Sequence, residues 1–129
     1  SEYGMDDDAL ITWCVWAKET LERKSPHDRN ISLLDLSKNA IGDRGCRTLV
    51  RLLFNLGAGV RILKLQSNKL GRASAFAIAA LLRSPRMPMH ELHLSHNFID
   101  KEGAAELLKS VAVATTGEVP AYPLTWKRS

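Results

Sequence analysis

Leucines alternate with polar residues in three short segments of the chain, and each segment leads into residues with a helical spacing. The segments are 34–39, 63–68 and 92–97, and each reads leucine, polar residue, leucine, two polar residues and asparagine. Alternation of this kind predicts a strand, and apolar residues recurring every three or four positions predict a helix. Corresponding residues lie 29 positions apart both times, so the pattern predicts three copies of one strand–helix unit.

The helix of each copy is predicted from the apolar positions that follow the asparagine. These positions predict helices over about 43–55, 72–83 and 101–112. The inward positions agree from copy to copy: Leu49, Ile78 and Leu107; Leu53, Leu82 and Val111; Val50, Ala79 and Leu108. A further set, Ile41, Leu70 and Ile99, is expected to fill the turn before the helix. Matching inward residues allow successive copies to stack on one continuous core.

Another helix is predicted ahead of the copies, over 6–23. Leu10, Cys14, Ala17 and Leu21 recur on one face of this segment. Three aspartates at 6–8 suit its start, where acidic side chains bond free backbone N–H groups and complement the helix dipole. Since the end of a stack of repeats exposes its core, we expect residues 1–29 to form a helical cap.

The organisation predicted for the rest of the chain is three units followed by a partial one. The units span about 30–58, 59–87 and 88–116. Residues 117–129 begin with a loop that contains two prolines, and Leu124 and Trp126 then repeat the strand pattern with a displacement of 32 residues. We expect a degenerate fourth strand there, at which the sequence stops as in a piece of a longer protein.

Asn39, Asn68 and Asn97 close the three strands, and a structural role is expected for them. A buried amide can satisfy backbone groups that a tight bend leaves unpaired. The repeat period places one asparagine beside the next, so we expect an asparagine ladder along the stack.

Two segments resemble leucine-rich repeats: 33–45, LLDLSKNAIGDRG, and 92–103, LHLSHNFIDKEG. The long period and the turn into a full helix resemble the ribonuclease-inhibitor-like subfamily. The resemblance implies an α/β solenoid, a short right-handed horseshoe with a parallel concave sheet and outer helices, that binds other proteins inside the cell. The middle copy departs from the pattern, because Gly71-Arg72-Ala73-Ser74 replaces Gly-Asp-x-Gly. We expect this change to weaken the cap of its helix.

The concave face is the first candidate site, because side chains between the core leucines point away from the helices. These side chains mix aliphatic, charged and amide or hydroxyl groups, which fits protein recognition better than a phosphate track. We predict that they bind another protein, as in a scaffold or targeting domain. The nine residues are Leu33, Asp35 and Ser37; Ile62, Lys64 and Gln66; Glu91, His93 and Ser95.

A basic convex patch is the alternative site. Net charge is +4, divided into −3 over residues 1–30 and +7 over residues 31–129. Arg44, Arg47 and Arg51 share the outer side of the first repeat helix and are candidates to hold nucleic acid for a larger processing enzyme. No aromatic residues alternate with these arginines as a stacking platform would require, so a solvated helix face is the competing interpretation.

Other chemistries find little support in the sequence. His90, His93 and His96 do not share one face of a strand, so no metal site is predicted, and no catalytic constellation or cofactor motif is found. Cys14 and Cys46 fall on inward faces and are expected to be reduced core residues. The chain shows no apolar run long enough to span a bilayer and no secretory leader. We therefore expect an intracellular protein, without a membrane partner, in the cytoplasm or nucleus.

Overall fold

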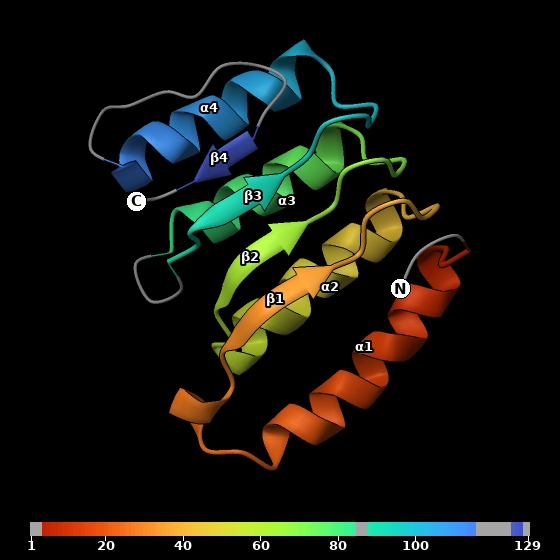
Figure 1. Cartoon of the computed structure of the whole chain (residues 1–129), viewed down its shortest axis with the longest axis vertical. Helices are drawn as coiled ribbons and strands as arrows, with labels where there is room; N and C mark the ends of the chain where they lie inside the picture. The colour runs from red at the N-terminus through yellow and green to blue at the C-terminus, as the bar shows by residue number, and fades with distance from the viewer. Residues whose placement is uncertain (1–3, 85–87, 116–124, 128–129) are drawn as a thin grey trace.

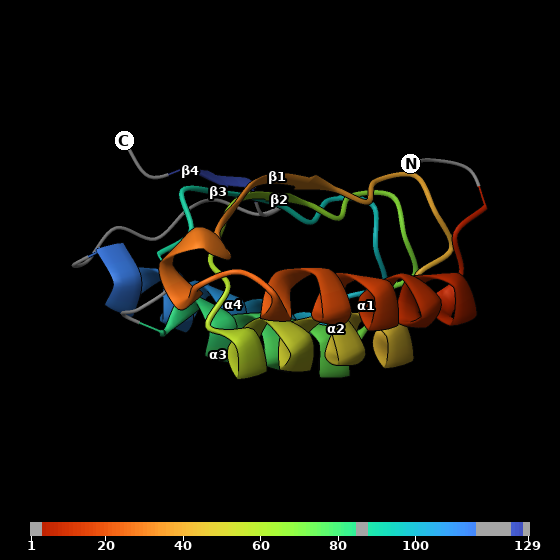
Figure 2. The same cartoon turned by 90° about the horizontal axis from the view of Figure 1, so that it is seen from below.

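Strands and helices form two layers in the computed structural model, which describes residues 4–84, 88–115 and 125–127 (Figures 1 and 2). The strands lie side by side in one layer, and helices α1 to α4 cover one face of the sheet. In chain order the elements are α1 (Asp7–Glu22), the short helix η1 (Pro26–Asp28), β1 (Ile31–Asp35), α2 (Asp43–Leu56), β2 (Val60–Lys64), α3 (Arg72–Leu82), β3 (Glu91–His93), α4 (Lys101–Thr115) and β4 (Thr125–Lys127).

The sheet has the order β1-β2-β3-β4, and its first three strands are parallel. Leu34 pairs with Leu63, and Leu63 pairs with Leu92, so the strand register equals the 29-residue period of the sequence. The predicted strand–helix units are confirmed in this part of the chain. An α/β arrangement with a small parallel sheet results.

The fourth strand differs from the expected copy in its direction. β4 pairs with β3 antiparallel, with Trp126 opposite Leu92. In the three preceding copies, an asparagine after the strand bonds to backbone at the end of a strand, and residues 124–129 contain no asparagine. The loop predicted from 117 to 123, and Leu124 of the predicted strand, fall on residues outside the described part of the chain.

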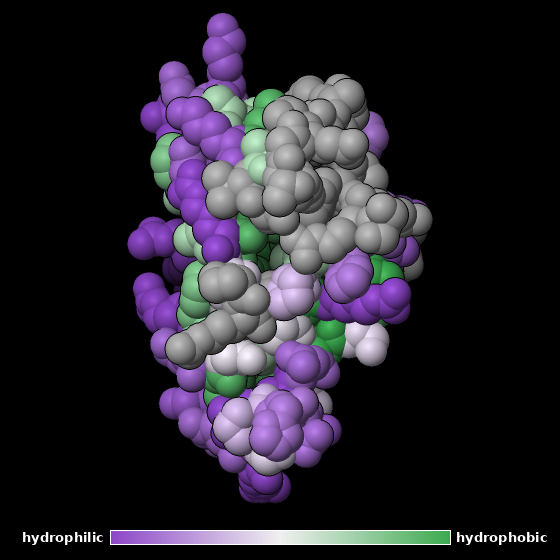
Figure 3. Space-filling model, turned by 90° about the vertical axis from the view of Figure 1, so that its left-hand side faces the viewer, coloured by the Kyte–Doolittle hydropathy of each residue, from purple (hydrophilic) through white to green (hydrophobic). Residues whose placement is uncertain are grey.

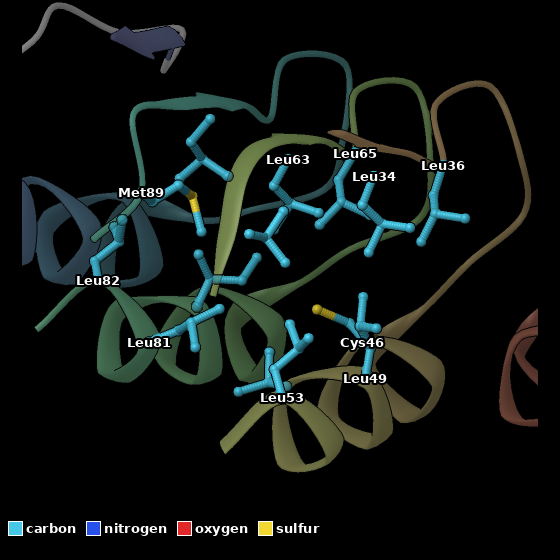
Figure 4. Packing of buried hydrophobic residues seen from close by; sticks show 14 of the residues in the cluster. Leu34, Leu36, Cys46, Leu49, Leu53, Leu63, Leu65, Leu81, Leu82 and Met89 are labelled. Atoms are coloured by element: carbon cyan, nitrogen blue, oxygen red, sulfur yellow. The ribbon is translucent and has the colours of Figure 1, made fainter. Parts of the chain in front are cut away.

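The core lies between the two layers and is built from the repeated apolar positions. In Figure 4, Leu34, Leu36, Leu63 and Leu65 of the strand layer point toward Cys46, Leu49 and Leu53 of α2. Burial of this apolar surface is the main stabilising term for such a fold. Hydrophilic side chains dominate much of the described surface in Figure 3, with apolar atoms visible between them.

The helices lie close to the predicted boundaries, whereas β1 and β2 begin three residues before the predicted strand segments and end within them. Asp6 caps α1 by accepting a hydrogen bond from the backbone N–H of Ala9 at 2.9 Å. Helix α2 ends at Gly57, whose left-handed conformation at φ 61° costs glycine little. Helix α4 continues to Thr115, three residues beyond the predicted end.

Arg29 connects the C-terminal ends of α1 and α2, and the sequence analysis missed this role. Its Nε donates to the carbonyl oxygen of Leu21 at 3.0 Å, and its Nη1 donates to the carbonyl oxygen of Leu56 at 3.2 Å. These carbonyls belong to the last turns of two helices, where acceptors commonly lack an intrahelical partner, and that of Leu21 also accepts from the backbone N–H of Lys24. One guanidinium thus joins the ends of both helices.

Cys14 and Cys46 are free and buried, as expected for core residues. Burial raises the pKa of Cys14 to about 11 and that of Cys46 to about 12. Both side chains are therefore neutral thiols at physiological pH. None of the described helices combines the length and apolar character that crossing a membrane requires.

Candidate binding surfaces

The predicted concave-face residues lie in three rows across β1, β2 and β3. Cross-strand pairing defines two of the rows, and backbone bonds from Lys38 to Gln66 and from Ser67 to Ser95 define the third. Neighbouring strands are about 4.8 Å apart, so each row is continuous. The rows are Leu33, Ile62 and Glu91; Asp35, Lys64 and His93; Ser37, Gln66 and Ser95.

A sharp bend after each strand turns the chain toward the helix layer. Lys38, Ser67 and His96 occupy the same place in three copies, and their φ angles of 59°, 60° and 57° are left-handed. This conformation is uncommon for residues other than glycine, and the bonds around it must hold it in place. In each copy the next residue is the asparagine predicted to do so.

Asn68 holds its own bend and the preceding one. Its Nδ2 donates to the carbonyl oxygens of Leu65 at 3.1 Å and Leu36 at 2.9 Å. Its Oδ1 accepts from the backbone N–H of Ile41 at 3.0 Å, and the side chain is buried. A buried amide with these partners satisfies groups that the bend would otherwise leave unpaired.

Asn97 and Asn39 occupy the equivalent positions. Asn97 donates to Leu65 at 2.9 Å and accepts from Leu70 at 2.9 Å, which joins the third copy to the second. Asn39 accepts from Met5 at 2.9 Å, which joins the first copy to the segment before α1. The ladder is therefore built from bonds between each amide and the backbone of the preceding unit.

The middle row carries opposite charges side by side. A hydrogen bond from the Ser37 hydroxyl lowers the pKa of Asp35, and the Ser37 N–H and the charge of Lys64 act in the same direction. The Ser37 hydroxyl lies 2.6 Å from Asp35 Oδ1, and Ser37 is buried while the other eight residues are not. On β3, Nε2 of His93 lies 2.6 Å from Oε1 of Glu91.

Gln66, in the third row, has an unusual environment. Its side-chain Oε1 is buried and has no hydrogen-bond partner among the described residues. A buried acceptor without a donor is destabilising, because it has lost its bonds to water. A rotation of this amide toward a donor on a bound partner would remove that cost.

The convex helices carry arginines that are paired with acids of a neighbouring unit. Arg44 lies 2.5 Å from Asp8, and Arg83 lies 2.7 Å from Glu106. Arg72 binds both Asp100, at 2.7 Å, and Glu102. Each pair joins two adjacent units, so three of the fourteen basic residues in 31–129 are balanced at short range by acids on this side of the molecule.

The predicted basic patch is therefore divided. Arg44, Arg47 and Arg51 are all exposed on α2, but Arg44 is held by Asp8 of α1. Arg47 lies close enough to Asp43 for its charge to lower the pKa of that carboxyl. Arg51 lines a groove between α1 and α2, together with Ile11, Val15 and Leu52.

Two aspartates missed by the sequence analysis cap the helices of the following units. Oδ1 of Asp7 accepts from the N–H of Gly42 at 2.7 Å, at the start of α2. Oδ1 of Asp43 accepts from the N–H groups of Gly71 and Ser74, at 2.9 and 3.0 Å, at the start of α3. The expected weak cap of α3 is wrong, because the cap comes from the preceding helix.

A comparison with models of protein families finds a match for two segments of the chain. Residues 27–50 and 87–108 match the family model described as a leucine-rich repeat. Two segments of the chain are therefore similar to leucine-rich repeats. The two matched segments cover the first and third copies, and the parallel β1–β3 sheet with its helices fits a leucine-rich-repeat fold. A comparison with curated proteins finds no match for the chain.

Leucine-rich repeats are commonly protein-interaction modules and are typically not catalytic. Within the described residues, no group of three or more histidine, cysteine, aspartate or glutamate side chains is placed to hold a metal ion. His90 and His93 are partly buried and His96 is exposed, and His93 has Glu91 as its neighbour. The surface features of these leucine-rich repeats are thus the strand rows and the paired charges on the helices.

Proposed function

We propose that the chain is a non-catalytic protein-interaction module, a scaffold or targeting domain of a larger intracellular protein. It binds its partner through the concave strand face of a short right-handed horseshoe of the ribonuclease-inhibitor-like type. Residues 1–29 serve as its helical cap and residues 30–116 as its three repeats. The partner is another protein, and no cofactor takes part.

The continuous row of Asp35, Lys64 and His93 is the observation that carries the proposal. It crosses three strands in register, and a partner that lies across the sheet meets all three side chains. Leu33 and Ile62 in the adjacent row add exposed or partly exposed apolar surface beside the charges. A polar row beside apolar contacts is typical of protein–protein interfaces.

The ion pairs on the convex helices argue against the nucleic-acid alternative. Arg44, Arg72 and Arg83 are bound to acids of a neighbouring helix, so a nucleic acid would have to displace those acids to reach the guanidinium groups. Phosphate binding depends on the release of counterions from nucleic acid by free cationic side chains. Arg44, Arg72 and Arg83 would therefore gain less from that release than unpaired arginines would.

Reversal of the central charge tests the proposal. Lys64→Glu places a second acid beside Asp35, between it and His93, and it should weaken binding of a partner captured by the wild-type chain about five-fold or more. Titration calorimetry measures the dissociation constant. The melting temperature should hardly change, since Lys64 is not part of the core.

Arg51→Glu is the matched control on the helix side. It reverses the same charge on an exposed residue of α2, and binding of a concave-face partner should be unchanged. The opposite order, with Arg51→Glu harmful and Lys64→Glu neutral, would show that the convex side is the working surface. Salt-sensitive binding of RNA that Arg51→Glu abolishes would then favour the nucleic-acid alternative.

A further inference from the structure

Residues 5–22 occupy the place that the helical half of a repeat has in the following units. Backbone bonds of one kind join each bend to the bend before it, and Met5 is the acceptor ahead of the first repeat. The three bonds, each 2.8 Å long, run from Ala40 to Met5, from Lys69 to Ile41 and from Phe98 to Leu70. Met5 therefore stands where Ile41 and Leu70 stand in the following units.

Side-chain bonds repeat the same equivalence. Asn39 accepts from Met5 as Asn68 accepts from Ile41, at 2.9 and 3.0 Å. Asp7 accepts from the start of α2 as Asp43 accepts from the start of α3. Residues 5–22 thus contact the first repeat in the way that the helical half of one repeat contacts the next.

Exposure at equivalent positions shows that α1 is covered less than the other helices. Trp16 corresponds to Leu52, Leu81 and Ser110, which are 8%, 2% and 0% exposed, whereas Trp16 is 59% exposed. Leu52 lines the groove on the α1 side of α2, so the residue at this position faces the preceding unit. The exposure of Trp16 therefore marks the face of α1 that a further unit of the stack would cover.

Trp13, on the side of α1 nearer the core, is also less buried than its equivalents in the repeats. It corresponds to Leu49, Ile78 and Leu107, which are almost completely buried, but Trp13 is only partly buried. The rings of Trp13 and Trp16 lie with their centroids 6.4 Å apart, so the two indoles form one apolar patch.

The edge of the sheet beside this patch is open. Among the described strands, β1 pairs with β2 alone. Leu34 pairs with Leu63, and the N–H of Leu36 donates to the carbonyl of Lys64. Because alternate N–H groups of a strand point to opposite edges, those of Leu33 and Asp35 point away from β2.

We propose that this end of the stack binds an extended segment of a partner protein as an added strand, parallel to β1 and with a Leu-x-Leu pattern. The main-chain groups of Leu33 and Asp35 pair with the segment, and its two leucines cover Trp13. The described strands β1, β2 and β3 already show this arrangement, because each strand, with the residue that follows it, lays two buried leucines over the helix layer. Addition of a strand to an exposed edge is an established mode of peptide binding.

A tethered strand tests the proposal without depending on the affinity of a free peptide. A copy of residues 59–69 is joined through a flexible glycine–serine linker to the N-terminus of the whole chain, which gives it a high effective concentration. Amide hydrogen exchange, followed by NMR, reports on the N–H groups of Leu33 and Asp35. We expect both amides to exchange at least about ten-fold more slowly than in the chain without the tail.

Two comparisons decide whether the protection comes from strand pairing. A tail whose two leucines are both replaced by aspartate should give no protection, and equal protection from it would overturn the proposal. Unchanged exchange with the leucine tail would overturn it as well.

Leu33→Pro and Leu33→Ala form the matched pair of variants. Proline removes an N–H that points to the open edge, whereas alanine keeps it, and both shorten the same exposed side chain. With the tail present, protection of Asp35 should be lost in Leu33→Pro and retained in Leu33→Ala. If Leu33→Pro does not fold, Trp16→Glu on the exposed indole position takes its place and should reduce the protection at least several-fold.

Discussion

Helices α3 and α4 begin at equivalent positions of two successive repeats, but different residues cap them. The start of α3 is capped by Asp43, which belongs to the preceding helix and accepts from Gly71 and Ser74. The start of α4 is capped by its own Asp100, whose Oδ1 accepts from the N–H of Gly103 at 2.9 Å. Both devices satisfy N–H groups that have no partner within the helix.

The residue at the position of Asp43 explains the difference. In the next repeat this position is Arg72, and a guanidinium has no acceptor to offer to an N–H group. Helix α4 therefore needs its own acceptor, and it has Asp100 where α3 has Gly71. Arg72 in turn donates to Asp100 at 2.7 Å.

Glycine at the start of α3 fits the same rule. A Cβ on Gly71 would lie 3.0 Å from Oδ2 of Asp43, so the neighbour's carboxylate fills the space of a side chain. Gly42 is in the same position relative to Asp7, at 3.3 Å. The pairs Asp7 with Gly42 and Asp43 with Gly71 show that a cap in this array belongs to the junction between two units.

Removal of the cap from the neighbouring helix should have the largest effect. Asp43→Ala leaves two backbone N–H groups and the buried hydroxyl of Ser74 without their acceptor. The free energy of unfolding should fall by roughly 1–3 kcal/mol, the usual cost of an unsatisfied buried group or a lost cap. Urea denaturation followed by circular dichroism measures it.

Asp43→Asn is the control for this variant. It keeps a side-chain oxygen in nearly the same place, so it should recover a substantial part of the stability lost in Asp43→Ala. Equal losses in the two variants would mean that the charge of Asp43, and not its hydrogen bonds, stabilises the junction.

The effect of Gly71→Asp on stability should change sign when the cap supplied by Asp43 is removed. In the native chain, Gly71→Asp brings a second carboxylate against Asp43 and should destabilise by about 1 kcal/mol. In the Asp43→Ala background the same change supplies α3 with the cap that Asp100 gives α4, and it should stabilise by about 1 kcal/mol. A double-mutant cycle by urea denaturation checks both signs, and additive effects would contradict the junction rule.

The sequence predicted those parts of the molecule that depend on pattern within one unit. The 29-residue period, the Leu-x-Leu strands and the buried inward positions were all readable, because each follows from local spacing. The asparagines were also found, since their place in the unit is constant. Their bonds to the preceding unit were not, because Asn68 and Leu36 are 32 residues apart.

The features that were missed depend on which residues of adjacent units meet. The cap of α3 was assigned to its own repeat, although Asp43 lies 28 residues before Gly71. The arginines were counted as a patch along one helix, whereas Arg44 finds its acid 36 residues earlier. Predicting such pairs requires knowing which residues of two stacked units lie close together.

As the pH falls, the native chain should lose the stabilising contribution of Asp43 at the α2–α3 junction. A variant without this carboxyl has no such contribution to lose. Burial opposes ionisation of Asp43, but hydrogen bonds from Ser74 and Gly71 outweigh it and lower the pKa of this carboxyl. A group with a lowered pKa in the folded state stabilises the fold above its unfolded pKa, and that contribution is lost as pH falls through the folded value.

The difference in unfolding free energy between the native chain and Asp43→Asn measures this contribution. It should be constant from about pH 7 to pH 5 and should shrink below about pH 4, near the unfolded pKa of an aspartate. Urea melts at several pH values test it. A difference that grows toward low pH would show that the pKa of Asp43 is raised in the folded protein.

The ion pair at the α3–α4 junction should matter least for stability. Arg72 and Asp100 are both largely exposed, and exposed pairs are screened by water and salt. Arg72→Ala should therefore shift the melting temperature by less than about 3 °C at low ionic strength, and by less still in 0.5 M salt. Asp100 keeps its bond to Gly103 in this variant, so the cap of α4 survives the loss of the arginine.

Asp100→Ala removes that cap as well and should lower the melting temperature further, by an amount that salt does not reduce. If Arg72→Ala were instead as harmful as Asp43→Ala, the two junctions would depend equally on the residue at this position, and the distinction between a buried cap and a surface ion pair would fail.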